Sequence, residues 1–246
     1  MKRINVGVVG CGDIATRSYL PGLMNSPVVK LEAAVDVMSE RVEEACRKYS
    51  IPKSYTSYEA FLKDKDVDLV LILTPIPMHF GQAKEALMAG KHVYAEKPLA
   101  MTRKETDELM DLAKQKGLLL SAAPALILSQ TNQAVKELLE QDAIGTIAFS
   151  RSHSSHGGAA WSPFWTTDPS WFFKKGGGPL YDMGVYQFHL MTYLMGPARR
   201  VTAMSRLAFP VRQIRSGPAK GKVVHGDIDD CTLLMMEMSN NSFCFV

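Results

Sequence analysis

The pattern of hydrophobic and polar positions divides the chain into two regions. From residue 4 to about residue 122, short apolar runs alternate with amphipathic stretches, which is typical of strands in a parallel sheet and of the helices that cover it. We therefore expect a doubly wound α/β domain over residues 1–122. The predicted strands are Ile4–Val9, Leu31–Val37, Leu69–Thr74, His92–Ala95 and Leu118–Ala122, and the predicted helices are Ile14–Met24, Ser39–Tyr49, Met78–Ala89 and Thr102–Lys116.

Small and polar residues mark the ends of several of these helices. Ser39 is expected to cap one helix, and Thr102-Arg103-Lys104-Glu105 has the spacing of a capping box, in which side chains at both ends bind backbone amides. Gly90 and Gly117 stand where glycine commonly ends a helix.

Residues 123–246 follow a different pattern, with fewer helices and longer polar connections. Asn240-Asn241 predicts a hairpin turn between two of the later strands. We expect a second, α+β domain over 123–246 with an open, mostly antiparallel sheet. Its predicted helices are Asn132–Gln141 and Pro179–Met195, and its predicted strands are Thr146–His153, Arg200–Phe209, Cys231–Met238 and Ser242–Val246.

The last of these strands is apolar up to the final residue. An apolar strand at the edge of a sheet pairs readily with another strand. We expect a further strand or a second subunit to cover it, and we expect the complete sheet to have C-terminal strands that this sequence lacks.

Composition narrows the class of protein. The net charge is +3, charged residues make up 22% and hydrophobic residues 46%, which is ordinary for a globular enzyme and not typical of a nucleic-acid-binding protein. The four cysteines are scattered without metal-ligand spacing, which favours reduced thiols in a cytoplasm. No apolar run reaches the roughly 20 residues of a membrane span. We expect a cytoplasmic protein with neither nucleic-acid nor membrane partners.

A glycine-rich turn follows the first predicted strand. Its sequence, Gly10-Cys11-Gly12-Asp13-Ile14-Ala15, has the spacing of a dinucleotide-binding fingerprint with alanine at the third position. Gly10 allows the tight turn, Gly12 lets the backbone approach a pyrophosphate, and Ala15 permits close helix packing. The helix N-terminus would supply amide donors to the phosphates. The predicted cofactor-binding residues here are Gly10, Gly12, Asp13, Ile14 and Ala15.

Asp36 ends the second predicted strand, where an acid binds the adenosine ribose hydroxyls and repels a ribose phosphate. This favours NAD, although Arg41 nearby leaves NADP open. The alternative is a glycine turn beside a solvated aspartate. Thr74 and Pro75 end the third predicted strand and are expected, with His79, to line the nicotinamide side. His79 fits a helix N-terminus or a cofactor-lining position better than a general base.

Glu96-Lys97-Pro98 follows the next strand, at the edge where open α/β sheets bind ligands. A lysine there is costly to bury unless it is paired, and proline makes the turn rigid. Lys97 is therefore the first catalytic candidate; the alternative is a surface lysine.

Together, the glycine turn, Thr74 to His79, Glu96-Lys97-Pro98 and Gly176-Gly177-Gly178-Pro179 to Tyr186 resemble the glucose–fructose oxidoreductase/inositol dehydrogenase (Gfo/Idh/MocA) family. The resemblance implies an N-terminal Rossmann domain and a C-terminal domain whose open sheet often forms the homo-oligomer interface. It also implies oxidation of sugars or polyols, or reduction of the matching carbonyls, with NAD(P), usually in longer chains.

The resemblance also assigns roles to residues. The family lysine, here Lys97, contacts substrate and nicotinamide ribose, and Glu96 belongs to the same cofactor-side motif. The family carries an aspartate and, four residues on, a histidine after the glycines; Asp182 matches and Tyr186 replaces the histidine. The proton-transfer residue therefore stays open.

Hydride transfer leaves a hydroxyl proton to be moved. A free tyrosine is a poor base at neutral pH, but a nearby ammonium favours its ionised form, so Lys97 and Tyr186 form a candidate pair. Asp182 lies one helical turn before Tyr186 and could orient either group or bind a sugar hydroxyl. His189 is either a relay or a packing residue. The predicted catalytic residues are Lys97, Asp182 and Tyr186.

Aromatic residues gather between the strand ending at His153 and the glycine run. They either stack on a sugar ring or pack the domain, and we weigh the two equally. His153 and His156 face opposite sides of a strand and lack a third ligand, so we expect no metal. The aromatic residues are Trp161, Phe164, Trp165, Trp171 and Phe172, and the predicted substrate-binding residues are Lys97, Arg151, Trp165, Asp182, Tyr186 and His189.

Three functions remain open from the sequence. The first is an NAD(P)-dependent dehydrogenase or reductase acting on a sugar, a sugar derivative or a cyclic polyol. The second is an NAD-dependent glycosidase that oxidises its substrate transiently, and the third is a non-catalytic NAD(H)-binding protein.

Overall fold

The computed structural model describes residues 3–163, 165 and 167–246. Its contacts separate residues 1–123, with the segment 164–167, from residues 124–163 and 168–246. We call these the first and the second unit and describe each by itself. Phe164, one of the aromatic residues considered above, lies outside the described residues.

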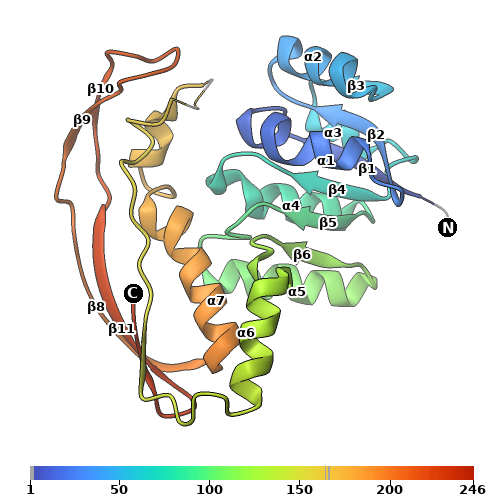
Figure 1. The fold of residues 1–246 in the computed structure, drawn as a ribbon. Helices are drawn as coiled ribbons and strands as arrows, with labels where there is room; N and C mark the ends of the chain where they lie inside the picture. The colour runs from blue at the N-terminus through green and yellow to red at the C-terminus, as the bar shows by residue number, and fades with distance from the viewer. Residues whose placement is uncertain (1–2, 164, 166) are drawn as a thin grey trace. The chain divides into compact units, whose positions relative to one another are not determined.

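The first unit is built on a six-stranded parallel sheet (Figure 1). The strand order β3-β2-β1-β4-β5-β6 reverses direction between β1 and β4, as in a doubly wound fold, so the predicted α/β class is confirmed. The strands are β1 (Ile4–Val9), β2 (Val29–Val35), β3 (Lys53–Tyr55), β4 (Leu69–Ile72), β5 (His92–Ala95) and β6 (Leu120–Ala122).

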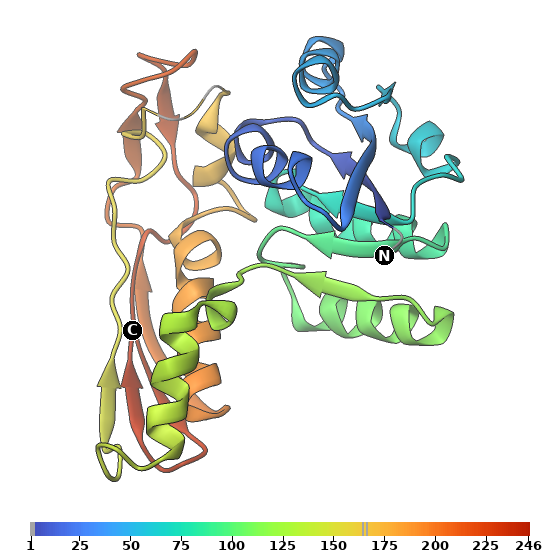
Figure 2. The same cartoon turned by 45° about the vertical axis from the view of Figure 1, so that its right-hand side comes forward.

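Helices pack on both faces of this sheet (Figure 2). Neighbouring residues of β1 point to opposite faces, so that Val8 joins one core with Leu20 and Val42 while Val9 joins the other with Phe61 and Leu109. The helices are α1 (Leu20–Met24), α2 (Ser39–Tyr49), α3 (Tyr58–Leu62), α4 (His79–Met88) and α5 (Arg103–Lys116).

The first helix is wider than an α-helix over part of its length. Ala15–Tyr19 form a π-helical turn that runs directly into α1, and the Leu20 amide donates to the Ala15 carbonyl. Pro21 has no amide to give the carbonyl of residue 17, which is a known reason for a helix to widen or bend. The Tyr49 hydroxyl donates to the Thr16 carbonyl at 2.8 Å and so holds the widened turn.

Among the predicted helix ends, two are confirmed and one is wrong. Thr102 forms the predicted capping box with Glu105, and Gly117 ends α5 with φ +63°, as predicted. The prediction that Ser39 caps α2 is wrong, because Met38 is the capping residue. Met38 donates its amide to Asp36 Oδ1 at 2.9 Å, and this turn also ends β2 at Val35, two residues before the predicted end.

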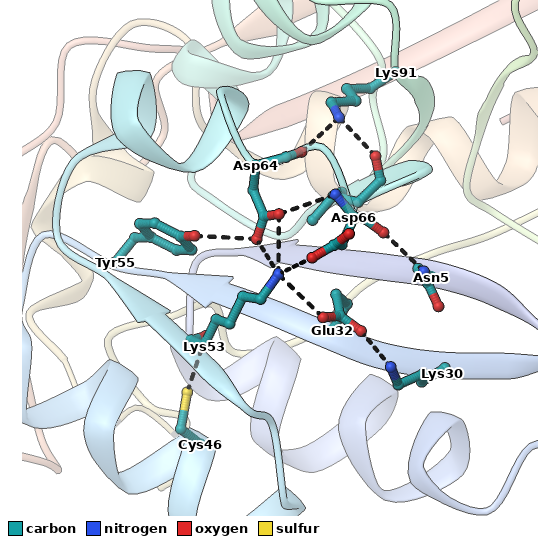
Figure 3. A network of polar contacts seen from close by, with 10 residues as sticks. Asn5, Lys30, Glu32, Cys46, Lys53, Tyr55, Asp64, Asp66 and Lys91 are labelled. Carbon is teal, nitrogen blue, oxygen red and sulfur yellow. Dashed lines mark hydrogen bonds and ion pairs between the residues drawn. The ribbon is translucent and has the colours of Figure 1, made fainter.

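A network of charged side chains fixes β3 at the edge of the sheet (Figure 3). The Lys53 ammonium lies 3.2 Å from Glu32, 3.0 Å from Asp64 and 2.6 Å from Asp66. The Tyr55 hydroxyl also donates to Asp64, at 3.0 Å. Partial burial works to raise the pKa of Asp64, but hydrogen bonds from the Asp66 amide, Lys53 and Tyr55 outweigh it and lower the pKa overall.

The second unit contains a four-stranded sheet in the order β7-β12-β11-β8. β8, β11 and β12 are antiparallel, and β7 joins β12 in parallel, so the sheet is open and mostly antiparallel, as predicted. A separate two-stranded hairpin, β9 with β10, was not predicted. The elements are α6 (Gln130–Glu140), β7 (Phe149–Arg151), α7 (Val185–Met195), β8 (Ala198–Arg206), β9 (Val211–Gln213), β10 (Val223–His225), β11 (Cys231–Met238) and β12 (Phe243–Phe245).

One face of this sheet is covered and the other is open (Figures 1 and 2). Met191 and Met195 of α7 pack on Leu234 and Met236 of β11. β7 is shorter than the predicted strand Thr146–His153 because its neighbour β12 has only three residues to pair with it. None of the helices within the described residues is long and apolar enough to cross a membrane.

Candidate functional site

The glycine turn after β1 has the backbone shape that a nucleotide needs. Gly10 has φ +91°, and a Cβ there would lie 3.0 Å from the Leu73 carbonyl oxygen. A Cβ at Gly12 would meet no atom within 4 Å, so the backbone is open on that side. Ala15 is fully buried and Ile14 is exposed at the start of the helix. The turn thus fits a dinucleotide, with glycine required at Gly10 and room above Gly12.

Asp36 joins this turn to the end of β2. Its Oδ2 accepts the Cys11 amide at 2.8 Å and its Oδ1 accepts the Met38 amide at 2.9 Å. Each carboxylate oxygen can accept a second hydrogen bond, so the pair of ribose hydroxyls can still be bound. Burial, followed by the Asp36 charge, raises the pKa of the Cys11 thiol to about 12, so the thiol stays protonated and unreactive.

His79, at the first position of α4, is 1% exposed and lies between two loops. Its Nε2 lies 2.7 Å from the Thr74 carbonyl oxygen and its Nδ1 lies 2.7 Å from the Pro98 carbonyl oxygen. The Thr74 hydroxyl donates to Gln82 at 2.6 Å, and Pro75 begins the short turn before α4. His79 therefore connects the loop after β4 with the loop after β5, and its ring does not reach the surface.

Glu96-Lys97-Pro98 forms the loop after β5, with a cis peptide between Lys97 and Pro98. Glu96 accepts the Lys97 amide at 3.0 Å and the Tyr19 hydroxyl at 2.6 Å. Burial and this bond to Glu96 raise the pKa of Tyr19, which stays a neutral donor. Lys97 is 9% exposed. Sequence reasoning missed Tyr19, because nothing in its helix marks it as the partner of a residue far along the chain.

The second unit places Asp182 in a π-helical turn, Leu180–Gly184, that leads into α7, the helix of Tyr186 and His189. All three side chains are half-buried. The His156 Nε2 lies 3.9 Å from Asp182 Oδ2. The Gly158 amide donates to His156 Nδ1 at 2.8 Å, so the neutral ring carries its proton on Nε2, facing Asp182.

The glycine run before Asp182 allows close packing. A Cβ at Gly177 would lie 2.6 Å from the Phe172 carbonyl oxygen, and one at Gly178 would lie 2.4 Å from Ile228 Cδ1. The contact at Gly177 is with rigid backbone and leaves no room for a side chain, whereas at Gly178 the φ of +91° favours glycine. Phe172 and Ile228 line a pocket of about 100 Å³ that belongs wholly to the second unit.

The pocket contains residues that sequence reasoning missed, and none of the six residues predicted to bind substrate lines it. Arg212 and Asp230 line the pocket, whereas Lys97, Arg151, Trp165, Asp182, Tyr186 and His189 do not. Arg151 pairs with Phe245 across the sheet, and Trp165 belongs to the segment grouped with the first unit. The turn residues Gly217-Pro218 and Gly221 could have indicated the β9–β10 hairpin that carries Arg212. Among the described residues, no three His, Cys, Asp or Glu side chains are grouped as metal ligands.

Comparison with known families agrees with this geometry. Residues 4–123 match the oxidoreductase family with an NAD-binding Rossmann fold, and residues 132–246 match the GFO/IDH/MocA C-terminal domain. The chain belongs to the GFO/IDH/MocA family. Both the Rossmann domain and the separate C-terminal sheet are thereby accounted for.

Curated GFO/IDH/MocA relatives include enzymes whose names contain a sugar or a sugar derivative. The chain is 34% identical to dTDP-3,4-didehydro-2,6-dideoxy-alpha-D-glucose 3-reductase of Streptomyces violaceoruber, over 82% of the chain and 57% of that protein. It is 28% identical to levoglucosan dehydrogenase of Pseudarthrobacter phenanthrenivorans, over 98% of the chain and 66% of that protein. The chain thus spans less than two thirds of the length of these relatives.

Solved structures of similar fold include proteins with a bound or named nucleotide cofactor. An NAD-binding protein from Listeria innocua has a TM-score of 0.80 at 27% identity, covering 100% of this chain and 64% of that one. KijD10, a 3-ketoreductase from Actinomadura kijaniata in complex with NADP and TDP-benzene, has a TM-score of 0.77 at 25% identity, covering 99% and 69%.

Proposed function

We propose that this chain supplies the cofactor-binding and substrate-binding parts of an NAD(P)-dependent oxidoreductase that prefers NAD. The reaction we assign is hydride transfer between nicotinamide and a hydroxyl-bearing or carbonyl carbon of a sugar, a sugar derivative or a cyclic polyol. The observation that carries the proposal is the glycine turn after β1, whose Cys11 amide is held by Asp36 at 2.8 Å. The sugar-derived names of the two curated relatives support the substrate class.

The preference for NAD rests on charge. Asp36 places a carboxylate beside the turn, and a second anion, the ribose phosphate of NADP, would be repelled there. The hydroxyls of NAD would instead donate to the carboxylate oxygens. The cofactor contacts that we assign are to Gly10, Gly12, Asp13, Ile14, Ala15, Asp36, Thr74, Pro75, Glu96 and Lys97, with His79 acting through the loops that it connects.

We assign the proton chemistry to Lys97, Asp182 and Tyr186. When bound, the nicotinamide accepts or supplies the hydride at the reacting carbon. In oxidation, the phenolate of Tyr186 takes the hydroxyl proton, and in reduction the phenol returns it. We assign Lys97 to position the proton acceptor and Asp182 to accept a hydrogen bond from a substrate hydroxyl. The near-complete burial of Lys97 supports a role at a closed site.

The test is a panel of sugars, sugar derivatives and cyclic polyols with NAD and NADP, read by absorbance at the nicotinamide band in both directions. We expect turnover with NAD for at least one probe. Lys97→Ala should lower kcat about 100-fold or more, with a much smaller change in NAD affinity, while the exposed control Lys104→Ala should match the wild type. Steady cleavage of a glycoside without absorbance change would contradict the proposal and favour transient oxidation.

We also propose a cytoplasmic location. The support is chemical: all four cysteines are free thiols, as expected in a reducing compartment.

A further inference from the structure

The π-helical turn of the first helix ends on a tyrosine that packs beside β5. Tyr19 is half-buried, and its ring meets the Tyr94 ring edge-on, with the centroids 6.3 Å apart and the planes at 64°. The Glu96 amide donates to the Ile72 carbonyl at 2.8 Å, so the extended chain of β5 continues one residue past its end. Alternate residues of an extended chain share a side, which places Glu96 on the same side as Tyr94. Single π-helical turns inside helices are frequent at functional sites.

The Glu96 carboxylate is held by two donors from different elements. The Tyr19 hydroxyl donates to its Oε1 at 2.6 Å, and the Lys97 amide donates to its Oε2 at 3.0 Å. Hydrogen bonds to an ionised acceptor are stronger than bonds between neutral groups. One donor belongs to the loop of Glu96 itself and moves with it. The bond from Tyr19 therefore fixes the carboxylate to the first helix.

Tyr19 thereby connects two parts of the first unit to which we assign cofactor contacts. Its helix starts at the glycine turn after β1, and Glu96 belongs to the loop after β5. Lys97 is nearly buried, and its backbone amide is bound to the carboxylate that Tyr19 holds. A displaced Glu96 would consequently displace the backbone from which the Lys97 side chain starts.

We infer that Tyr19 is a positioning residue, whose hydroxyl fixes the Glu96 carboxylate and, through it, the backbone of Lys97. The inference rests on the proposed function for the role of Lys97, and it adds a residue from outside the Glu96-Lys97-Pro98 motif. Tyr19 stays a neutral donor, as described above, so it holds its acceptor without moving a proton in the reaction.

The first test needs neither cofactor nor substrate. Tyr19→Phe keeps the ring and removes only the hydroxyl, and amide hydrogen exchange of the intact chain is followed by NMR. We expect the Lys97 amide to exchange about tenfold faster or more, because its acceptor is no longer fixed. The Leu73 amide, which donates to the Val9 carbonyl at 2.8 Å in the core of the sheet, is the reference and should be unchanged.

A merely structural role for the hydroxyl gives a different result. Loss of overall stability would speed exchange at Lys97 and Leu73 alike, and a hydroxyl without influence would leave both unchanged. Either outcome overturns the inference. Tyr55→Phe is the matched control, because it also removes a hydroxyl that donates to a carboxylate, Asp64 at 3.0 Å, and it should leave the Lys97 amide as in the wild type.

The second test is a double-mutant cycle on turnover, with a substrate found in the cofactor panel. Tyr19→Phe should lower kcat about tenfold in the wild-type background, because the reacting groups lose their alignment. In the Glu96→Ala background it should change kcat by less than about twofold, because no carboxylate is left to position. Tyr55→Phe should leave kcat unchanged. Equal losses in both backgrounds overturn the inference, as does a shift of the pH profile of kcat in Tyr19→Phe, which would indicate a proton carrier.

The two tests separate this inference from the proposed function. If no probe in the panel is turned over, the proposed reaction is contradicted, and the exchange of the Lys97 amide still decides whether Tyr19 holds this loop. If turnover is found and Tyr19→Phe leaves both the Lys97 amide and kcat unchanged, the positioning role alone is contradicted.

Discussion

A single carboxylate determines both the shape and the charge of the nucleotide turn. Asp36 accepts the amides of Cys11 and Met38, so it holds the glycine turn and ends β2 at the same time. The prediction that Asp36 binds the ribose hydroxyls was made only from its charge and its position in the sequence. The structure adds a reason why the turn keeps its form before any ligand binds.

Asp36→Asn keeps an acceptor oxygen but removes the negative charge. We expect the ratio of kcat/KM for NAD to that for NADP to fall at least tenfold, because the repulsion of the ribose phosphate is lost. Steady-state kinetics with both cofactors measures this ratio. Glu40→Gln, which removes an exposed acid from the first turn of α2, is the control and should leave the ratio unchanged. An unchanged ratio in Asp36→Asn would show that the acid does not select the cofactor.

His79 is the buried connection between the loops that end in Thr74 and Lys97-Pro98. His79→Phe keeps a ring but removes both nitrogens, so the contacts to the Thr74 and Pro98 carbonyl oxygens are lost, including the one N–H bond that a neutral imidazole donates. We expect the free energy of unfolding to fall by about 1–3 kcal/mol and the KM for NAD to rise. Urea denaturation and cofactor titration measure the two effects. The exposed His225→Phe should change neither, and full stability in His79→Phe would contradict the role.

At the scale of elements, long periodic segments could be predicted and short or irregular ones could not. β1, β5 and α5 were predicted within one residue of their ends, since buried apolar runs and a capping box define them. β3 and α3 have three and five residues, too few to show a period. The widening of the first helix could not be predicted, although Pro21, which has no amide to donate within the helix, gives a reason for it.

The same limit applies to the candidate site. Lys97 and Asp182 could be named because each stands in a motif, and Asp36 because it ends a strand. The partners Tyr19 and Arg212 could not, because each meets its neighbours through tertiary packing. The hairpin that carries Arg212 has strands of three residues each, so hydrophobic alternation gave no sign of it.

The charged network around Lys53 makes β3 sensitive to acid. The pKa of Asp64 is lowered in the folded state, so its stabilising contribution is present above its unfolded pKa of about 3.9 and is lost as the pH falls through the folded value. Asp64→Asn should cost about 1–2 kcal/mol at pH 7. The variant should also lose less further stability than the wild type between pH 4 and pH 2. Urea midpoints across this range test both, with Asp111→Asn on the exposed side of α5 as the control.

At the scale of the whole molecule, the exposed apolar face of the second sheet is the feature that indicates a binding partner. Met204 of β8 and Leu233 of β11 lie opposite each other in register and are 80% and 71% exposed. Phe245 of β12, opposite Met235, extends the same apolar surface. Contiguous apolar surface of this kind usually marks an interface. We therefore propose that a second copy of the chain covers it, and that the chain is a homo-oligomer through its C-terminal sheet.

This proposal predicts that charge on the open face separates the copies. Leu233→Lys puts an ammonium on each side of a symmetric contact, where like charges meet and lose their water, so sedimentation velocity should show a shift from oligomer to monomer. Met88→Lys makes the same change at an exposed methionine of α4 in the first unit and should leave the oligomer intact. A wild-type chain that sediments as a monomer at all concentrations would contradict the proposal. If both variants dissociate, the contact cannot be assigned to this sheet, because a change in the first unit would then have the same effect.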